Sequence, residues 1–189
     1  GVIDALVENN HILKANDGRI YLTTNAKNQL LKGVVNNTGI IEANSVDGLN
    51  SNEVILFAHG GLANVTGSIE AKGGFVETSA DKVKIADNFK VTANKWLIDP
   101  ADFTIATSGG DITGATLSSN LASTANVEIK SVNGTVNTNG KGDIYVNDSI
   151  TYTNSTLVLD AQNDIFINNE ININGSGILN LKYGQNGNA

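Results

Sequence analysis

Cysteine and methionine are absent from the 189 residues, and proline, tryptophan and arginine each occur once. Without cysteine the chain has no disulfide framework, no thiolate metal site and no cysteine nucleophile. The single arginine, Arg19, and a formal net charge of -7 argue against contacts with nucleic-acid phosphates. His11 and His59 are the only histidines, and neither has a serine or aspartate at a recognisable catalytic spacing. We therefore expect no nucleic-acid partner and no histidine-dependent catalysis.

Long apolar runs are missing as well. No run approaches the roughly 20 residues that cross a bilayer, and the first residues lack the basic start of a signal peptide. The composition does not shift along the chain in a way that marks a second domain. The sequence predicts one domain over residues 1–189 and no membrane span.

Asparagine and glycine are abundant, with 28 and 20 residues, alongside many serine, threonine, valine and isoleucine residues. Asparagine and glycine tolerate the left-handed backbone conformation that tight corners require. β-Branched residues favour strands. This composition predicts short strands that are joined by tight turns.

A repeat of 21 residues supports that expectation. The segment 143–147 (DIYVN) recurs as 164–168 (DIFIN). At the same shift Ile150 and Tyr152 map onto Ile171 and Ile173, and a third strand follows after one extra residue. Each strand alternates apolar and polar residues, so that one face is buried and the other is solvated.

Three short strands in each repeat predict an all-β fold, a right-handed parallel β-helix that forms a three-sided solenoid with coils of about 21 residues. A uniform period would give about nine coils over this length. A β-sandwich is the alternative, but it gives no reason for side-chain identity and spacing to repeat over three consecutive strands. One helix is expected over residues 26–34, with Asn25 as its N-cap. Looser matches to the strand pattern lie at 19–24, 39–43, 53–59, 74–79, 83–86, 96–98, 103–106 and 127–130.

Several segments are similar to the two-partner secretion exoproteins, the filamentous haemagglutinin-like family that includes high-molecular-weight adhesins. They are residues 18–23 (GRIYLT), 30–43 (LLKGVVNNTGIIEA), 73–79 (GGFVETS) and 95–105 (KWLIDPADFTI), the last of which leads into 110–113 (GDIT). The resemblance implies a secreted protein on the bacterial cell surface that acts as an adhesin in virulence. Its implied partners are an outer-membrane transporter and a host cell-surface or matrix ligand.

The amino-terminal secretion domain of that family, which engages the transporter, is not represented among these residues. We therefore expect the chain to be an interior fragment of a longer exoprotein. The same scaffold also serves haem or haemopexin acquisition proteins and contact-dependent inhibition proteins, and both stay open as alternatives. Within residues 95–105, Pro100 predicts a corner directly after a strand, and Trp96 is interpreted as a filler of the core or corner.

A polysaccharide-active enzyme is the rival class, because β-helices also host lyases and hydrolases. Such enzymes need clustered carboxylates in a groove, and the carboxylates here are dispersed along the sequence. Asp143 and Asp164 would lie one above the other, but both directly precede strands, and turn capping explains them. We expect no enzyme activity, no catalytic residue, no metal ligand and no cofactor.

Two kinds of candidate site remain. Six asparagines lie in Asn-x-Ser/Thr sequences, and the resemblance implies that such sites can carry sugars: Asn36, Asn64, Asn133, Asn147, Asn154 and Asn174. The 21-residue shift also predicts that Tyr145 and Phe166 point outward and stack as an exposed aromatic patch. At the next outward position, the shift predicts an amide ladder between Asn147 and Asn168.

Overall fold

The computed structural model describes residues 5–16, 18–24, 33–43, 52–131 and 140–184. Within these ranges the chain is all-β, with most residues in strands and one helix, α1 (Gly114–Leu121). The strands are β1 (Ala5–Asn9), β2 (Ile12–Lys14), β3 (Arg19–Thr24), β4 (Gly33–Asn37), β5 (Ile40–Glu42), β6 (Glu53–Val65), β7 (Ser68–Ile85), β8 (Lys90–Asp99), β9 (Phe103–Ile105), β10 (Thr124–Ser131), β11 (Ile144–Val146), β12 (Ile150–Thr153), β13 (Thr156–Ala161), β14 (Ile165–Ile167), β15 (Ile171–Asn174) and β16 (Ile178–Lys182).

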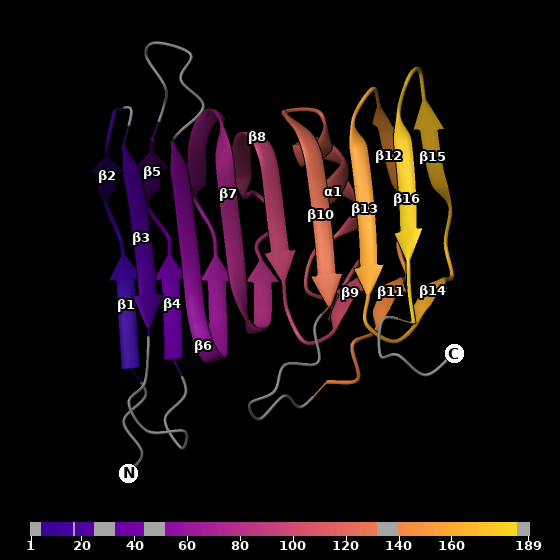
Figure 1. Cartoon of the computed structure of the whole chain (residues 1–189), viewed down its shortest axis with the longest axis horizontal. Coiled ribbons are helices and arrows are strands. Elements are labelled where there is room, and N and C mark those ends of the chain that lie inside the picture. Colours follow the sequence, from indigo (N-terminus) through magenta and orange to yellow (C-terminus); the bar gives the residue numbers. More distant parts are fainter. Residues whose placement is uncertain (1–4, 17, 25–32, 44–51, 132–139, 185–189) are drawn as a thin grey trace.

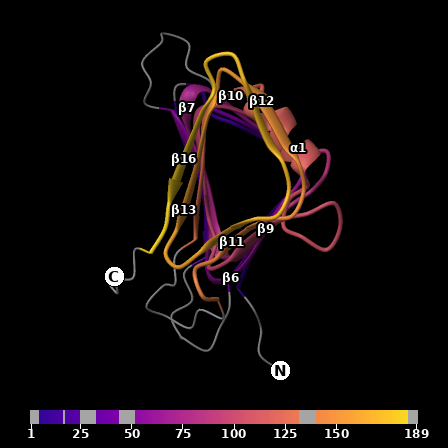
Figure 2. The same ribbon diagram turned by 90° about the vertical axis from the view of Figure 1, so that its right-hand side faces the viewer.

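The strand pairings among the described residues are all parallel, and they form sheets of eleven, three and two strands (Figure 1). The long strands β6 and β7 shift register between Ala58 and Leu62 and between Ala71 and Phe75. The shifts mark the points where these strands turn from one side of the molecule to the next. The end-on view shows strands on three sides of a common core (Figure 2).

Each of the three sides consists of a defined set of strands. The first side holds β3, the start of β6, the middle of β7, the end of β8, and then β10, β13 and β16. The second side holds β1, β4, the ends of β6 and β7, β9, β11 and β14. The third side holds β2, β5, the starts of β7 and β8, helix α1, β12 and β15.

Inward side chains stack in columns from strand to strand. On the first side one column consists of Ile20, Val54, Val76, Trp96, Val127, Leu157 and Leu179. Trp96 is fully buried in it, which confirms its predicted place in the core, and its Nε1–H donates to Thr78 Oγ1 at 3.1 Å. Burial of such columns is the main source of stability in a fold of this kind.

The 21-residue shift is confirmed where it was found. β11 pairs with β14, and β12 pairs with β15, in the predicted register. A uniform coil length is wrong, however, because neighbours in the Trp96 column are separated by between 20 residues (Val76 to Trp96) and 34 residues (Ile20 to Val54). Because several connections are longer than a 21-residue coil allows, seven described strands stack on the first side instead of about nine.

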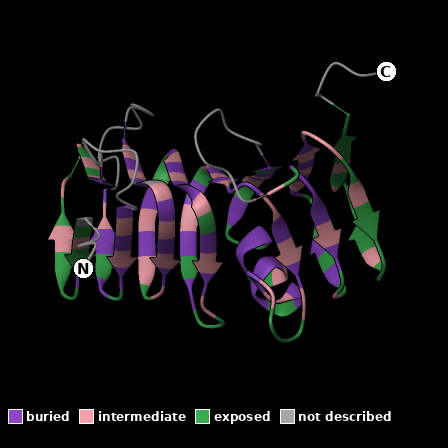
Figure 3. Cartoon of the chain, turned by 90° about the horizontal axis from the view of Figure 1, so that it is seen from below, coloured by how far each residue is buried: buried purple, intermediate pink, exposed green. Residues whose placement is uncertain are grey.

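Burial decreases toward both ends of the stack (Figure 3). Ile144 and Val146 in β11 are fully buried between β9 and β14. Their partners in β14 are less covered, since Ile165 is half-buried and Ile167 is 45% exposed. The register prediction therefore holds. Ile165 packs against the core without being fully buried, whereas the expectation that Ile167 lies in the core is wrong. β14 is the last described strand of its sheet and has no strand beyond it.

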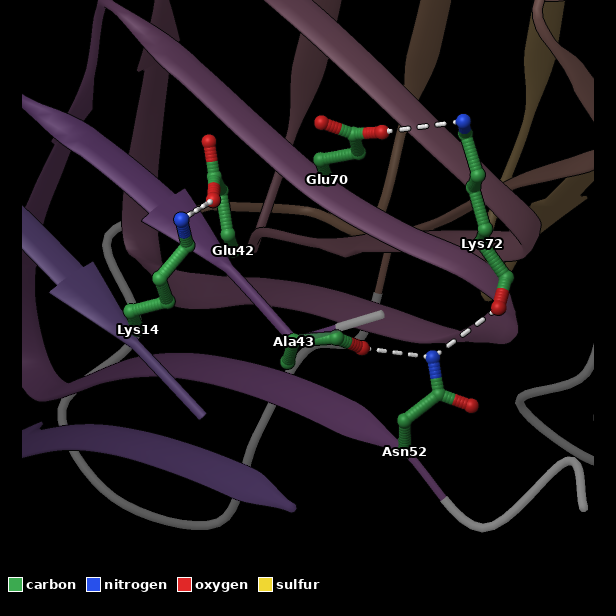
Figure 4. Close-up of polar contacts among 6 residues, drawn as sticks. All are labelled: Lys14, Glu42, Ala43, Asn52, Glu70 and Lys72. Carbon is green, nitrogen blue, oxygen red and sulfur yellow. Dashed lines mark hydrogen bonds and ion pairs between the residues drawn. The ribbon is translucent and has the colours of Figure 1, made fainter. Parts of the chain in front are cut away.

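Asparagines stabilise corners through their side chains and not, in general, through left-handed backbone. Asn52 is buried, and its Nδ2 donates to the carbonyls of Ala43 at 2.6 Å and Lys72 at 3.0 Å, which ties two corners together (Figure 4). Among the described residues other than glycine, only Asn154 has a positive φ, of 65°. The expected role of asparagine in left-handed corners is thus wrong for the other described asparagines.

Charged residues pair along an outward row near these corners. Lys14, Glu42 and Glu70 occupy equivalent positions on neighbouring strands of the third side. Lys14 Nζ lies 3.1 Å from Glu42 Oε2, and Lys72 Nζ lies 3.4 Å from Glu70 Oε1 (Figure 4). Exposed pairs of this kind contribute at most about 1 kcal/mol each.

Helix α1 replaces a strand on the third side. Thr113 caps its first turn, with its Oγ1 accepting from the Thr116 N–H at 3.1 Å, and Leu117 and Leu121 enter the core. This helix was not predicted. The helix predicted over residues 26–34 lies mostly outside the described residues, and its last two positions, Gly33 and Val34, belong to β4.

Within the part of the chain that the structure describes, no helix has the length and apolar character that crossing a bilayer requires.

Candidate interaction surface

The second side carries two rows of outward side chains, and one row borders an open depression of about 570 Å³. Register places the members of that row side by side on successive strands: Val34, Leu62 and Lys82 on β4, β6 and β7, and Thr104, Tyr145 and Phe166 on β9, β11 and β14. The depression lies where β7 and β9 are not paired directly. We call it the second-side groove.

Two of the three described carboxylates that line the groove, those of Asp102 and Asp111, accept hydrogen bonds from backbone, and Asp81 is the third. Asp102 Oδ1 accepts from the backbone N–H groups of Lys141, Gly142 and Asp143 at 3.0, 2.9 and 2.8 Å. Asp111 Oδ2 accepts from the Thr104 N–H at 2.9 Å. These bonds hold the two turns that border the groove, because a carboxylate satisfies several otherwise unpaired N–H groups.

Asp143 repeats the role of Asp102 one strand further along. Its Oδ1 accepts from Asn163 Nδ2 at 2.7 Å and from the Asp164 N–H at 3.1 Å. This confirms the prediction that Asp143 caps a turn and that Asp143 and Asp164 are neighbours. No cluster of three or more histidine, cysteine, aspartate or glutamate side chains in the described residues could hold a metal ion.

Lys84 also has a structural role. Its Nζ lies 2.9 Å from Asp111 Oδ1 and donates to the Gly110 carbonyl at 2.7 Å. This ties β7 to the segment that leads into α1. The neighbouring outward lysine, Lys82, borders the groove with an exposed side chain.

Tyr145 and Phe166 stack as predicted, with ring centroids 4.9 Å apart and an angle of 7° between the planes. Tyr145 is half-buried, and Phe166 is 40% exposed. The Tyr145 hydroxyl donates to Asp143 Oδ2 at 3.0 Å, and this hydrogen bond raises the pKa of Tyr145 above its ordinary value. The pair therefore offers an apolar strip beside a fixed hydroxyl.

The second outward row contains two pairs of amides, and Glu8 and Lys84 occupy the positions next to the first pair. Asn64 Nδ2 donates to Asn36 Oδ1, and Asn168 Nδ2 donates to Asn147 Oδ1, each at 2.8 Å. The predicted ladder between Asn147 and Asn168 is therefore confirmed. A ladder of this kind satisfies neighbouring amides along stacked strands.

The structure places five of the six candidate glycosylation sites, and Asn133 lies outside the described residues. Asn36, Asn64 and Asn147 use their amides in the ladders, and Asn154 Oδ1 accepts from the Ser176 N–H at 2.9 Å. Asn174 is exposed at the end of β15. A sugar would be attached to Nδ2, and among these bonds only that of Asn64 uses Nδ2 of a candidate asparagine. Asn147, Asn154 and Asn174 are exposed, whereas Asn36 and Asn64 are half-buried.

Sequence reasoning identified Tyr145 and Phe166 but missed Lys82, Thr104 and Asp111 as members of one surface. Lys82 lies on β7, Thr104 lies on β9 and Asp111 follows β9, and the 21-residue period relates none of them. They come together through backbone contacts outside the strand pairings, in which the Ala101 N–H donates to the Asp81 carbonyl and the Ile85 N–H donates to the Asp111 carbonyl.

No family model, no curated protein and no solved structure matches this chain. The surface is therefore interpreted from its own residues.

Asp99, at the end of β8, is the described carboxyl with the clearest perturbation. Its pKa is raised to about 6 from an ordinary 3.8, mainly because the carboxyl is buried. The Lys130 charge acts to lower the pKa, and the carboxylates of Glu77, Glu128 and Asp160 act to raise it. A strongly shifted carboxyl suggests a functional site only when it lies in a cleft. Asp99 does not border the second-side groove.

Asp99→Asn should therefore stabilise the protein at neutral pH. A raised pKa means that the folded state binds the proton more tightly, so stability is lost as pH rises from about 4 through 6. At about 1.4 kcal/mol per pH unit the loss is at most about 3 kcal/mol, and solvent screening reduces it to about 1 kcal/mol. Urea unfolding of both proteins at pH 4 and pH 7.5 tests this. A gain of the same size at both pH values would contradict it.

Proposed function

We propose that the chain is a right-handed parallel β-helix, a three-sided solenoid, and that it forms part of the surface-exposed shaft of a secreted bacterial adhesin exported by two-partner secretion. The observation that carries the proposal is the column from Ile20 to Leu179, which stays in register over seven parallel strands. Parallel strands joined by crossover connections are almost always right-handed.

A stack of this kind is suited to projecting a binding region. At about 4.8 Å per strand, the seven strands of the first side extend over about 29 Å. Each strand contacts only its neighbours, so that length can increase without a change in cross-section. The resemblance of residues 95–105 to two-partner secretion exoproteins supports placement of this rod on a bacterial surface.

The adhesive contact is assigned to the second-side groove. Tyr145 borders the groove with Phe166 stacked on it, and two amide pairs lie in the neighbouring row. Together with the Lys82 ammonium group they offer both apolar and hydrogen-bonding contacts to an extended ligand on a host cell or its matrix. Asp102 and Asp111, which line the groove, hold turns through hydrogen bonds from backbone N–H groups. We therefore propose binding and not catalysis.

Bead adhesion tests the binding role. Beads coated with the purified chain should bind epithelial cells or matrix proteins better than uncoated beads, and Lys82→Glu should reduce binding. Lys90→Glu is the matched control, because Lys90 is an exposed lysine on the third side. Binding no better than that of uncoated beads would contradict an adhesive role. An equal loss with Lys90→Glu would contradict the assignment of the groove.

Export tests the secretion class separately. The chain, fused behind the secretion domain of a two-partner system and expressed with its transporter, should reach the cell surface only when the transporter is present. Protease accessibility on intact cells measures this. Retention in the periplasm despite a working transporter would contradict the proposal.

A further inference from the structure

The layers of the stack are not all joined in the same way. The described residues between 5 and 99 form a first block, in which each layer pairs with the next by a parallel ladder on all three sides. Those between 103 and 184 form a second block, in which ladders join β9, β11 and β14 on the second side, β12 and β15 on the third side, and β10, β13 and β16 on the first side. The chain passes from the first block to the second at the Pro100 corner.

The two blocks meet at an interface that we call the seam. Among the described strands, one ladder crosses it, the pairing of β8 with β10 on the first side. On the second side, β7 and β9 belong to different sheets. On the third side, helix α1 lies beside β8, and a helix cannot continue a strand ladder. Two of the three sides of the seam therefore lack the ladder that joins each pair of layers within the first block.

Separate contacts close the second side of the seam. The Ile85 N–H donates to the Asp111 carbonyl at 2.8 Å, and the Ala101 N–H donates to the Asp81 carbonyl at 3.0 Å. Lys84 Nζ lies 2.9 Å from Asp111 Oδ1. These contacts join the two blocks without the regular pairing of a parallel ladder.

Side chains close the third side. Asn120 Oδ1 accepts from the Val91 N–H at 2.9 Å, and Ser123 Oγ donates to the Val91 carbonyl at 2.8 Å. Thr116 Oγ1 donates to the Asp87 carbonyl at 2.7 Å. The third side of the seam thus depends on the rotamers of a few polar side chains.

We propose that the seam opens reversibly in the native protein, with the two blocks separating on the second and third sides while β8 and β10 stay paired. In a stacked fold each layer is held by its neighbours, so the interface with the fewest ladders opens most easily. Lys82 of the first block and Tyr145 of the second both line the second-side groove, so opening widens the groove. The inference goes beyond the proposed function, because it requires neither adhesion nor secretion.

Amide hydrogen exchange, followed by NMR in the unmodified chain, tests the proposal with two neighbouring residues. The Ile85 N–H donates across the seam, whereas the Ala86 N–H donates to the Val65 carbonyl at 2.9 Å within the first block. After correction for intrinsic rates, Ile85 should exchange at least about tenfold faster than Ala86. The Ala101 N–H, which crosses the seam, should likewise exchange faster than the Phe103 N–H, which donates within the second block. Equal protection within each pair would overturn the proposal.

A variant separates opening of the whole seam from local fraying. Lys84→Met removes the ion pair across the seam and should accelerate exchange of both Ile85 and Ala101 about threefold, with Ala86 unchanged. Lys95→Met is the matched control, because Lys95 Nζ lies 2.7 Å from Glu128 Oε2 across the same two blocks on the paired first side. It should leave both rates unchanged.

Three results with these variants would contradict opening of the seam as a unit. They are acceleration by Lys84→Met that is confined to Ile85, no acceleration at either amide, and an equal acceleration by Lys95→Met. Far-UV circular dichroism checks that both variants keep the fold.

Discussion

Ile144→Asp should lower the free energy of unfolding by about 4 kcal/mol or more, because it leaves an unpaired charge in the core. Ile144 is fully buried between Phe103 of β9 and Ile165 of β14. The neighbouring aspartate, Asp143, would add repulsion and not a counter-ion. Urea unfolding followed by circular dichroism measures the loss.

The same replacement at Ile165 is the matched control. Ile165 occupies the equivalent position one strand further along, but it is only half-buried. Water reaches the new carboxylate there, so the cost should be about half as large, roughly 2 kcal/mol. Equal losses at the two positions would show that the end of the stack is covered in solution.

Asn120→Ala should cost about 3 kcal/mol, an effect large for the loss of a single amide. Asn120 Oδ1 accepts from the Val91 N–H at 2.9 Å, and its Nδ2 donates to the carbonyls of Phe89 and Thr116, each at 3.0 Å. The side chain is fully buried in α1. Its removal leaves buried backbone groups of β8 without partners and creates a cavity.

Asn126→Ala makes the same chemical change on the adjacent strand β10, where the Asn126 amide donates to the Asn94 carbonyl at an exposed position. Water replaces that bond, so the expected cost is below about 0.5 kcal/mol. Thermal unfolding of both variants gives the comparison. Losses of similar size would mean that the buried hydrogen bonds of Asn120 stabilise the fold no more than the exposed hydrogen bond of Asn126 does.

The sequence predicted those parts of the fold in which a local pattern is also the structural cause. Alternation fixes which side chains point inward, so the 21-residue shift was sufficient to pair Ile144 with Ile165 and to stack Tyr145 on Phe166. Pro100 likewise marked the corner after β8, because proline cannot donate to a ladder.

Helix α1 could not be predicted in the same way. Its apolar residues Leu117 and Leu121 lie four apart, but glycine, serine and asparagine dilute the helical signal, and no charged residue marks either end. The helix is held by bonds to distant residues, including Ser155 Oγ donating to the Leu121 carbonyl and the Gly114 N–H donating to Asp148 Oδ2. Such contacts have no local pattern.

The candidate site, too, could be predicted from the sequence only in part. Tyr145 and Phe166 were predicted because the repeat relates them directly. The groove was not, because its borders on β7 and β9 belong to different sheets and meet through backbone contacts such as the hydrogen bond from the Ala101 N–H to the Asp81 carbonyl. The abundance of asparagine was informative about corners but not about how they form, since an amide bonds to backbone groups that a sequence does not place.

Helix α1 also has a mechanical consequence. The first side is an uninterrupted ladder of backbone hydrogen bonds from β3 to β16, whereas on the third side the connection between β8 and β12 passes through α1 and side chains such as Asn120 and Ser118. Side-chain links are longer and have more rotatable bonds than a backbone ladder. On the second side, β7 and β9 are likewise not paired directly. The stack is therefore not equally stiff in all directions. Under a sideways load it should bend in the plane that opens or closes these two interrupted sides, and resist bending in the perpendicular plane.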